Sequence, residues 1–182
     1  MQSFQFCHGK NGQLNEGAVM AAYFANVRSV SEFGSQIWSG AAKTHLDRIE
    51  RVQHKFLLWL VHRTANRRMS SDLSYDGLLA LFKLPSLTSR RLQHDITLLY
   101  SIIKSRCDSM YLLSCFSIRV PSRTTRYRAS FFEPVARVNS VKNGMFCRLP
   151  RLANDFIARC PHVDLFHDSR SVVMKSVIMR VV

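Results

Sequence analysis

The chain has 182 residues, of which 47% are hydrophobic, and its 26 Lys and Arg residues against 12 Asp and Glu residues give a formal net charge of +14. The hydrophobic content excludes a wholly disordered chain and is enough to bury a core. The positive charge favours a polyanionic partner, nucleic acid before anionic membrane, with a basic protein that lacks such a partner as the alternative.

Cysteine usage and the first residues indicate a location inside the cell. The five cysteines are scattered without a C-x-x-C pair, which argues against a disulfide framework or a zinc finger. We therefore expect a reducing compartment, the nucleus or the cytoplasm. Residues 1–15 are polar and contain Gly9 and Gly12, so they are predicted to be irregular and not a signal peptide. No run approaches the roughly 18 apolar residues of a membrane span.

A first helix is predicted over residues 16–30, with Asn15 as its N-cap. Its apolar side chains recur at the spacing of a helix: Met20, Tyr23, Phe24 and Val27. Gly34 breaks the chain after this helix. Trp38 follows the break, and we expect it to be an anchor packed against the first two helices.

A second, two-faced helix is predicted to begin near His45 and to end near His62. Thr44 and Asp47 have the spacing of a capping box. One arc is apolar and is expected to face the core: Leu46, Ile49, Phe56, Leu57 and Leu60. The opposite arc is basic: Arg48, Arg51, Lys55 and His62. The ordinary solvated face of a soluble helix would show the same pattern, and that alternative stays open.

Two further helices follow a polar, basic run at residues 63–68. The first is predicted over residues 75–82 with Leu78, Leu79 and Phe82 turned inward, and Ser70, Ser71 and Asp72 are its candidate caps. Pro85 ends it, and Ser86 caps a longer helix over residues 87–104. The core stripe of this longer helix is Leu92, Ile96, Leu99 and Ile103. One more turn is expected at residues 111–113.

From Ile118 onward the sequence favours extended chain or a strand pair, because basic and aromatic residues alternate after Pro121. Asn143-Gly144 is a common hairpin-turn dipeptide. Helix is expected to return over residues 149–158. The apolar residues 172–182 are expected to dock as a strand or a helix and not to span a membrane.

These elements together predict a mainly α fold, a small helical bundle with a short β element (hairpin or strand pair) in the C-terminal third. The predicted segments are an irregular start at 1–15 and a helical domain at 16–117. They continue with a basic extended or β segment and short helix at 118–160, and a tail of unknown role at 161–182.

Catalytic and cofactor-binding arrangements find no support in the sequence. Two-metal nucleotidyl transfer needs clustered carboxylates, whereas this chain has no Asp-Asp dipeptide and mostly isolated acids. No glycine-rich phosphate loop occurs. A zinc site built from Cys160 and His162 with His167 or Cys147 lacks the usual paired spacing, and we prefer apolar thiols and solvated histidines. We therefore expect no catalytic residue, cofactor, metal or small-molecule substrate.

Arginine and lysine side chains are the candidate contacts to phosphate, because guanidinium groups bind phosphate through paired hydrogen bonds. The candidate nucleic-acid-binding residues are Arg48, Arg51, Lys55, Arg90, Arg119, Arg123, Arg126 and Arg128. The alternative for the last four is an arginine-rich loop that only aids solubility. Contacts of this kind position nucleic acid without reading its sequence.

Several separated patterns occur in a fixed order along residues 19–158. They are Arg28-Ser29-Val30, Glu32-Phe33-Gly34-Ser35 with Trp38-Ser39, residues 43–57, Leu84-Pro85-Ser86-Leu87 with Ser89-Arg90-Arg91-Leu92 and Asp95, and Val120-Pro121-Ser122-Arg123 with Thr125-Arg126. In this order they resemble the region downstream of the catalytic palm in reverse transcriptases of non-LTR (jockey-type) retrotransposons. Four residues are expected to be structural anchors: Gly34, Trp38, Phe56 and Pro85.

The resemblance implies a thumb and post-thumb fragment whose ancestral role is to hold template-primer nucleic acid, an RNA/DNA hybrid or duplex, beside the palm. The aromatic-x-Asp-Asp motif of the palm is missing, so the isolated chain is expected not to be an enzyme. A remnant reading frame is the first expectation. The alternatives are a stand-alone nucleic-acid-binding protein and a partner-binding helical domain. The oligomeric state is left open.

Overall fold

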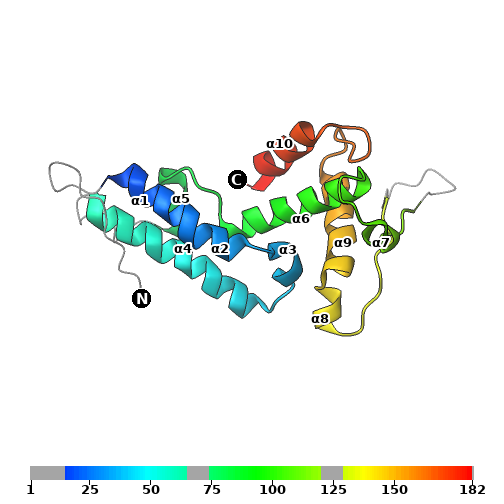
Figure 1. Cartoon of the computed structure of the whole chain (residues 1–182), viewed down its shortest axis with the longest axis horizontal. Coiled ribbons are helices and arrows are strands. Elements are labelled where there is room, and N and C mark those ends of the chain that lie inside the picture. Colours follow the sequence, from blue (N-terminus) through cyan, green and yellow to red (C-terminus); the bar gives the residue numbers. More distant parts are fainter. Residues whose placement is uncertain (1–14, 65–73, 120–128, 182) are drawn as a thin grey trace. The chain divides into compact units, whose positions relative to one another are not determined.

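A computed structural model describes residues 15–64, 74–119 and 129–181, and the chain divides into two compact units. The first unit comprises Met1–Phe33 and Thr44–Leu87, and the second comprises Gly34–Lys43 and Thr88–Val182. Figure 1 shows that the regular structure is helical, as the sequence predicts. The predicted boundary between residues 117 and 118 lies inside the second unit.

The first unit begins with one helical segment made of α1 (Glu16–Tyr23), the π-helical turn η1 (Phe24–Arg28) and α2 (Ser29–Glu32). The predicted cap is confirmed, because the Asn15 side chain accepts a hydrogen bond from the amide of Ala18 at 3.4 Å. The predicted helix over residues 16–30 is likewise present and is two residues longer.

The π-turn changes which side chains of this helix are covered. Tyr23 is buried, whereas Phe24 and Val27 are each 37% exposed. A π-turn contains one residue more than an α-turn, so the covered face moves from Tyr23 to Arg28 five residues later. Arg28 and Glu32 form an ion pair at 2.7 Å with side chains only 14% and 11% exposed. The helical spacing of Phe24 and Val27 in the sequence therefore does not produce a buried stripe.

The long helix α4 (Lys43–Thr64) and the short helix α5 (Tyr75–Leu81) complete the first unit. The buried side chains of Leu57, Val61 and Leu78 form their common core. The side chains packed against this core are Phe56, Leu58, Tyr75, Leu79, Phe82 and Leu84. The inward positions predicted for α5 are thus confirmed, while Ser70, Ser71 and Asp72 lie outside the described residues. The cap of α5 is Ser74, whose hydroxyl accepts from the amide of Gly77 at 3.2 Å.

The capping box predicted at Thr44 is wrong, because α4 already begins at Lys43 and Thr44 lies within its first turn. A turn precedes the helix, in which the amide of Ala41 donates to the carbonyl of Trp38 at 2.9 Å.

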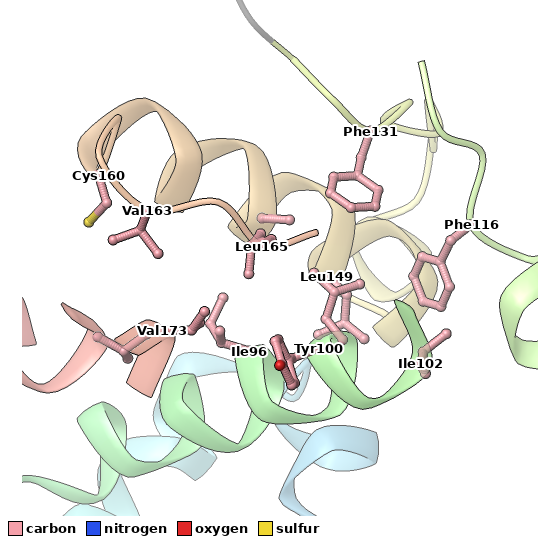
Figure 2. Close-up of a cluster of buried hydrophobic side chains, with 13 residues drawn as sticks. Ile96, Tyr100, Ile102, Phe116, Phe131, Leu149, Cys160, Val163, Leu165 and Val173 are labelled. Atoms are coloured by element: carbon pink, nitrogen blue, oxygen red, sulfur yellow. The ribbon is translucent and has the colours of Figure 1, made fainter. Parts of the chain in front are cut away.

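The second unit contains α3 (Ser35–Trp38), α6 (Leu87–Ile103), α7 (Met110–Ser114), α8 (Asn139–Lys142), α9 (Met145–Arg159) and α10 (Arg170–Val181). Its core is a cluster to which α6, α9, α10 and the segment between α9 and α10 contribute. Figure 2 shows Ile96 and Tyr100 of α6 near Leu149 of α9, with Leu165 beside them. The segment predicted only as a tail therefore contributes Val163, Leu165, Val173 and Val177 to the core of this unit.

The predicted strand pair is reduced to one isolated antiparallel bridge between Ile118 and Phe131. Its hydrogen bonds run from the amide of Arg119 to the carbonyl of Ser130 (2.8 Å) and from the amide of Phe132 to the carbonyl of Ser117 (2.9 Å). Within residues 15–64, 74–119 and 129–181 no strand is formed. The predicted β element is therefore not found in the described part of the chain.

The predicted hairpin turn at Asn143-Gly144 is wrong, because these residues connect α8 to α9. A two-residue hairpin turn of that kind requires positive φ at both positions, whereas Asn143 has φ −90° and Gly144 has φ −60°. Gly144 is the N-cap of α9. Helix α9 also begins four residues earlier than predicted and contains Pro150 within it. The C-terminal segment docks as the helix α10, with Val173 and Val177 buried.

Candidate nucleic-acid interface

The best-formed candidate site is the solvent side of α4. Its apolar arc is covered, since Leu57 and Leu60 are fully buried and Leu46, Ile49 and Phe56 are partly buried. The opposite arc is exposed: Arg48, Arg51, Lys55 and His62. The two faces predicted from the sequence are confirmed. We call Arg48, Arg51 and Lys55 the cationic face.

The carboxylate of Glu50, near the centre of α4, accepts hydrogen bonds from residues of the first unit. Its Oε1 atom accepts a hydrogen bond from the Tyr75 hydroxyl at 2.6 Å and another from the amide of Leu87 at 2.9 Å. Leu87 is the first residue of α6, so the carboxylate stabilises a helix N-terminus, where backbone amides lack partners within the helix. Glu50 thus points away from the cationic face, and Asp47, four residues before Arg51, is an exposed acidic side chain on that side of α4.

A chain of buried hydrogen bonds fixes the rotation of α4 about its axis. The Tyr23 hydroxyl donates to Gln53 Oε1 at 3.0 Å, and Gln53 Nε2 donates to the carbonyl of Pro85 at 3.1 Å. The ring of Tyr23 is stacked on that of Phe56, with centroids 4.1 Å apart. Phe56 and Pro85, two of the predicted anchors, both make contacts in this network. Because Gln53 and Phe56 are held, Arg48, Arg51 and Lys55 are held on the outer side.

Burial raises the pKa of the two tyrosines that donate to Gln53 and Glu50. It raises the pKa of Tyr23 to about 12. It also raises the pKa of Tyr75 well above the usual phenol value, and the hydrogen bond to Glu50 raises it further. Both hydroxyls therefore remain protonated donors to Gln53 and Glu50 at a higher pH than an ordinary tyrosine would.

The sequence interpretation missed Trp59 and Arg63, which continue the arc of the cationic face. The guanidinium carbon of Arg63 lies 5.8 Å from the centre of the Trp59 ring. That ring is tilted against Phe56, with centroids 6.1 Å apart. The i, i+4, i+8 spacing of Lys55, Trp59 and Arg63 was the available signal, since such residues share one face of a helix.

The remaining predicted contacts lie in the second unit or outside the described residues. Arg90 in α6 and Arg119, which is exposed beside the Ile118–Phe131 bridge, belong to the second unit. Arg123, Arg126 and Arg128 lie outside the described residues. Among the predicted residues of the first unit, the structure therefore places Arg48, Arg51 and Lys55 together on α4.

Two predicted anchors lie at the start of the second unit. Gly34 precedes α3 with φ +60°, a left-handed conformation that favours glycine. Trp38 is partly buried at the end of α3, and the guanidinium carbon of Arg91 lies 5.9 Å from the centre of its ring. Ser35 at the start of α3 contacts α6 through its hydroxyl, which lies 3.1 Å from His94 Nδ1.

Arg148, which contributes to the positive charge of the C-terminal third, is buried, and its guanidinium donates hydrogen bonds within the second unit. Its Nε and Nη2 atoms donate to the two carboxylate oxygens of Asp95 at 3.0 and 3.1 Å. Nη1 donates to the carbonyl of Asn143 (2.9 Å), and Nη2 also donates to the carbonyl of Gln36 (2.7 Å). Burial raises the pKa of Asp95, while Arg148 lowers it. Arg148 is therefore a structural residue.

Metal and membrane sites find no counterpart in the described residues. In that part of the chain no three His, Cys, Asp or Glu side chains gather to hold a metal ion. None of its helices combines the length and apolarity needed to cross a bilayer. Comparison with known proteins gives no family, because no family model, curated protein or solved structure matches the chain.

Proposed function

We propose that the protein binds nucleic acid without sequence specificity through the cationic face of α4. The observation that carries this proposal is the exposure of Arg48, Arg51 and Lys55 on one side of a helix whose central carboxylate, Glu50, is turned inward. From Arg48 to Lys55 the helix advances about 10 Å at 1.5 Å per residue. Several phosphates of one nucleic-acid strand fit within that length.

We also propose that this face corresponds to the thumb region of a non-LTR retrotransposon reverse transcriptase, where it holds template-primer nucleic acid. The ordered motifs at residues 28–39, 43–57 and 84–95 support this assignment. The missing aromatic-x-Asp-Asp motif supports a binding role without polymerase activity. A primer-extension assay with Mg²⁺ or Mn²⁺ tests the second part, and cDNA synthesis above background would contradict it.

The binding proposal is tested by replacing Arg48, Arg51 and Lys55 with Gln and measuring fluorescence anisotropy of labelled nucleic acid over a salt series. The variant should bind unrelated sequences more weakly and to a similar extent. Its salt slope should fall by up to roughly three, at about 0.9 per lost phosphate contact on duplex DNA.

The matched control replaces Arg159, Arg170 and Lys175 with Gln, since these are exposed cations of the second unit. Both variants remove three positive charges from a formal net charge of +14. If the control loses as much affinity as the α4 variant, net charge alone explains binding and the face is rejected. Unchanged binding in both variants would reject this face and place nucleic-acid binding on other residues, whereas no salt-dependent binding by the unaltered protein would favour a partner-binding domain.

A further inference from the structure

We propose that the cationic face of α4 ends in a stacking platform, formed by Trp59 and Arg63, that takes an unpaired base of a single-stranded nucleic acid. This inference rests on the proposed function and specifies the form of nucleic acid bound. It concerns the first unit alone, because both residues and the cationic face belong to α4.

Trp59 lies on the solvent side of α4 and not on its core side. At 100° per residue, Trp59 falls within about 40° of both Arg48 and Lys55 around the helix axis. Among the described residues, the side chains packed against the core of Leu57, Val61 and Leu78 do not include Trp59. A partly exposed indole in a row of cations fits nucleic-acid contact better than core packing.

A row of aromatic rings supports the indole from inside. The Trp59 ring lies against Phe56 at 6.1 Å, and Phe56 is stacked on Tyr23 at 4.1 Å. Tyr23 is fixed in turn by its hydrogen bond to Gln53. The platform is therefore held before a ligand arrives, which lowers the entropy lost on binding.

Arg63 adds a second planar group at this site. Its guanidinium carbon is 5.8 Å from the centre of the indole ring. Guanidinium and indole both stack on the flat faces of nucleobases, and because every base has such a face the contact tolerates any sequence. Lys55 and Arg51, one and two turns before Trp59, are then placed to contact the phosphates of the same strand.

Single strands fit this arrangement better than duplexes. Inside a duplex each base is covered by its neighbours, so an indole on a helix surface meets a base only where the strand is unpaired. A duplex would contact the cations of the face and leave Trp59 largely unchanged.

Tryptophan fluorescence tests the platform directly, because the chain has only two tryptophans. A Trp38→Phe variant of the full chain leaves Trp59 as the single indole. A short oligothymidylate should quench its emission, and a duplex of equal length should quench it much less. Equal quenching by the duplex would overturn the preference for single strands.

Substitution of the indole provides the second readout. Trp59→Leu should weaken oligothymidylate binding about 5- to 150-fold, which corresponds to about 1–3 kcal/mol for a stacked base, and Trp59→Phe should restore part of it. Trp38→Leu is the matched control, since that indole also has an arginine over its ring, at 5.9 Å. It should bind as the unchanged protein does.

The outcomes separate this inference from the proposed function. Oligothymidylate binding that depends on Arg48, Arg51 and Lys55 but not on Trp59 overturns the platform and keeps the cationic face. Binding that depends on neither set overturns both. Circular dichroism of each variant establishes that a loss of binding does not come from unfolding.

Discussion

Replacing Arg148 with Met should strongly destabilise the second unit. Methionine fills a similar volume but cannot donate the hydrogen bonds that Arg148 makes to Asp95, Asn143 and Gln36. The carboxylate of Asp95, a residue only 2% exposed, would remain buried without the guanidinium that neutralises it. Breaking a buried ion pair by removing one partner costs about 3–5 kcal/mol, so we expect a loss of that size in the free energy of unfolding.

The loss in the free energy of unfolding should depend on pH, and its direction follows from the pKa of Asp95. Burial already raises this pKa, and removing Arg148, which lowers it, raises it further. A carboxyl group whose pKa is higher in the folded chain than in the unfolded chain favours folding when it is protonated. The defect of Arg148→Met should therefore shrink as the pH falls through the raised pKa.

Urea denaturation followed by far-ultraviolet circular dichroism measures both effects. The double variant Asp95→Leu with Arg148→Met is the control, since removing both members of a buried ion pair leaves neither of them unpaired and often costs little. It should be more stable than Arg148→Met alone, with a coupling energy of at least about 2 kcal/mol. A loss under about 1 kcal/mol in Arg148→Met, or a double variant no better than the single one, would refute this reasoning.

Two substitutions and one titration have defined outcomes. Glu50→Ala should lower the free energy of unfolding by about 2–4 kcal/mol in thermal or urea melts, because the Tyr75 hydroxyl and the amide of Leu87 lose a charged acceptor. A near-neutral effect would mean that water replaces the carboxylate as acceptor. Gly40→Ala should be destabilising in the same melts, since a Cβ would lie 2.2 Å from the Asn143 carbonyl oxygen, and an unchanged melting temperature would contradict that close approach. Phenolate absorbance should show Tyr23 and Tyr75 ionising at a higher pH than an ordinary tyrosine. The free energy of unfolding should fall above about pH 10, because the unfolded chain releases protons that these two tyrosines retain in the folded chain. Coincident titration of all five tyrosines at the ordinary pH would argue against the network.

The two-faced character of α4 could be predicted because it is periodic within one helix. Leu57 and Leu60 recur on one side and Arg48 and Lys55 on the other, and no distant residue is needed to assign them. The N-cap at Asn15 is local in the same way. Such patterns predicted the helices and the exposed cations of the candidate site.

Contacts between distant residues could not be predicted from local spacing. Glu50 accepts from an amide 37 residues later, and Asp95 pairs with Arg148, 53 residues away. In the sequence these residues look like ordinary surface charges. The hairpin prediction at Asn143-Gly144 was wrong for another reason. Glycine occurs both in hairpin turns and as a helix N-cap, and here it precedes the apolar residues that begin α9.

The π-turn of residues 24–28 has a consequence for insertions and deletions. A π-turn is equivalent to one extra residue inserted into an α-helix. A chain lacking Ala25 would form a regular helix in which Arg28 follows Tyr23 by four positions instead of five. Arg28 and Glu32 would keep their side of the helix, so we expect the first unit to tolerate the loss of one residue at this turn better than at a regular turn of α1 or α4.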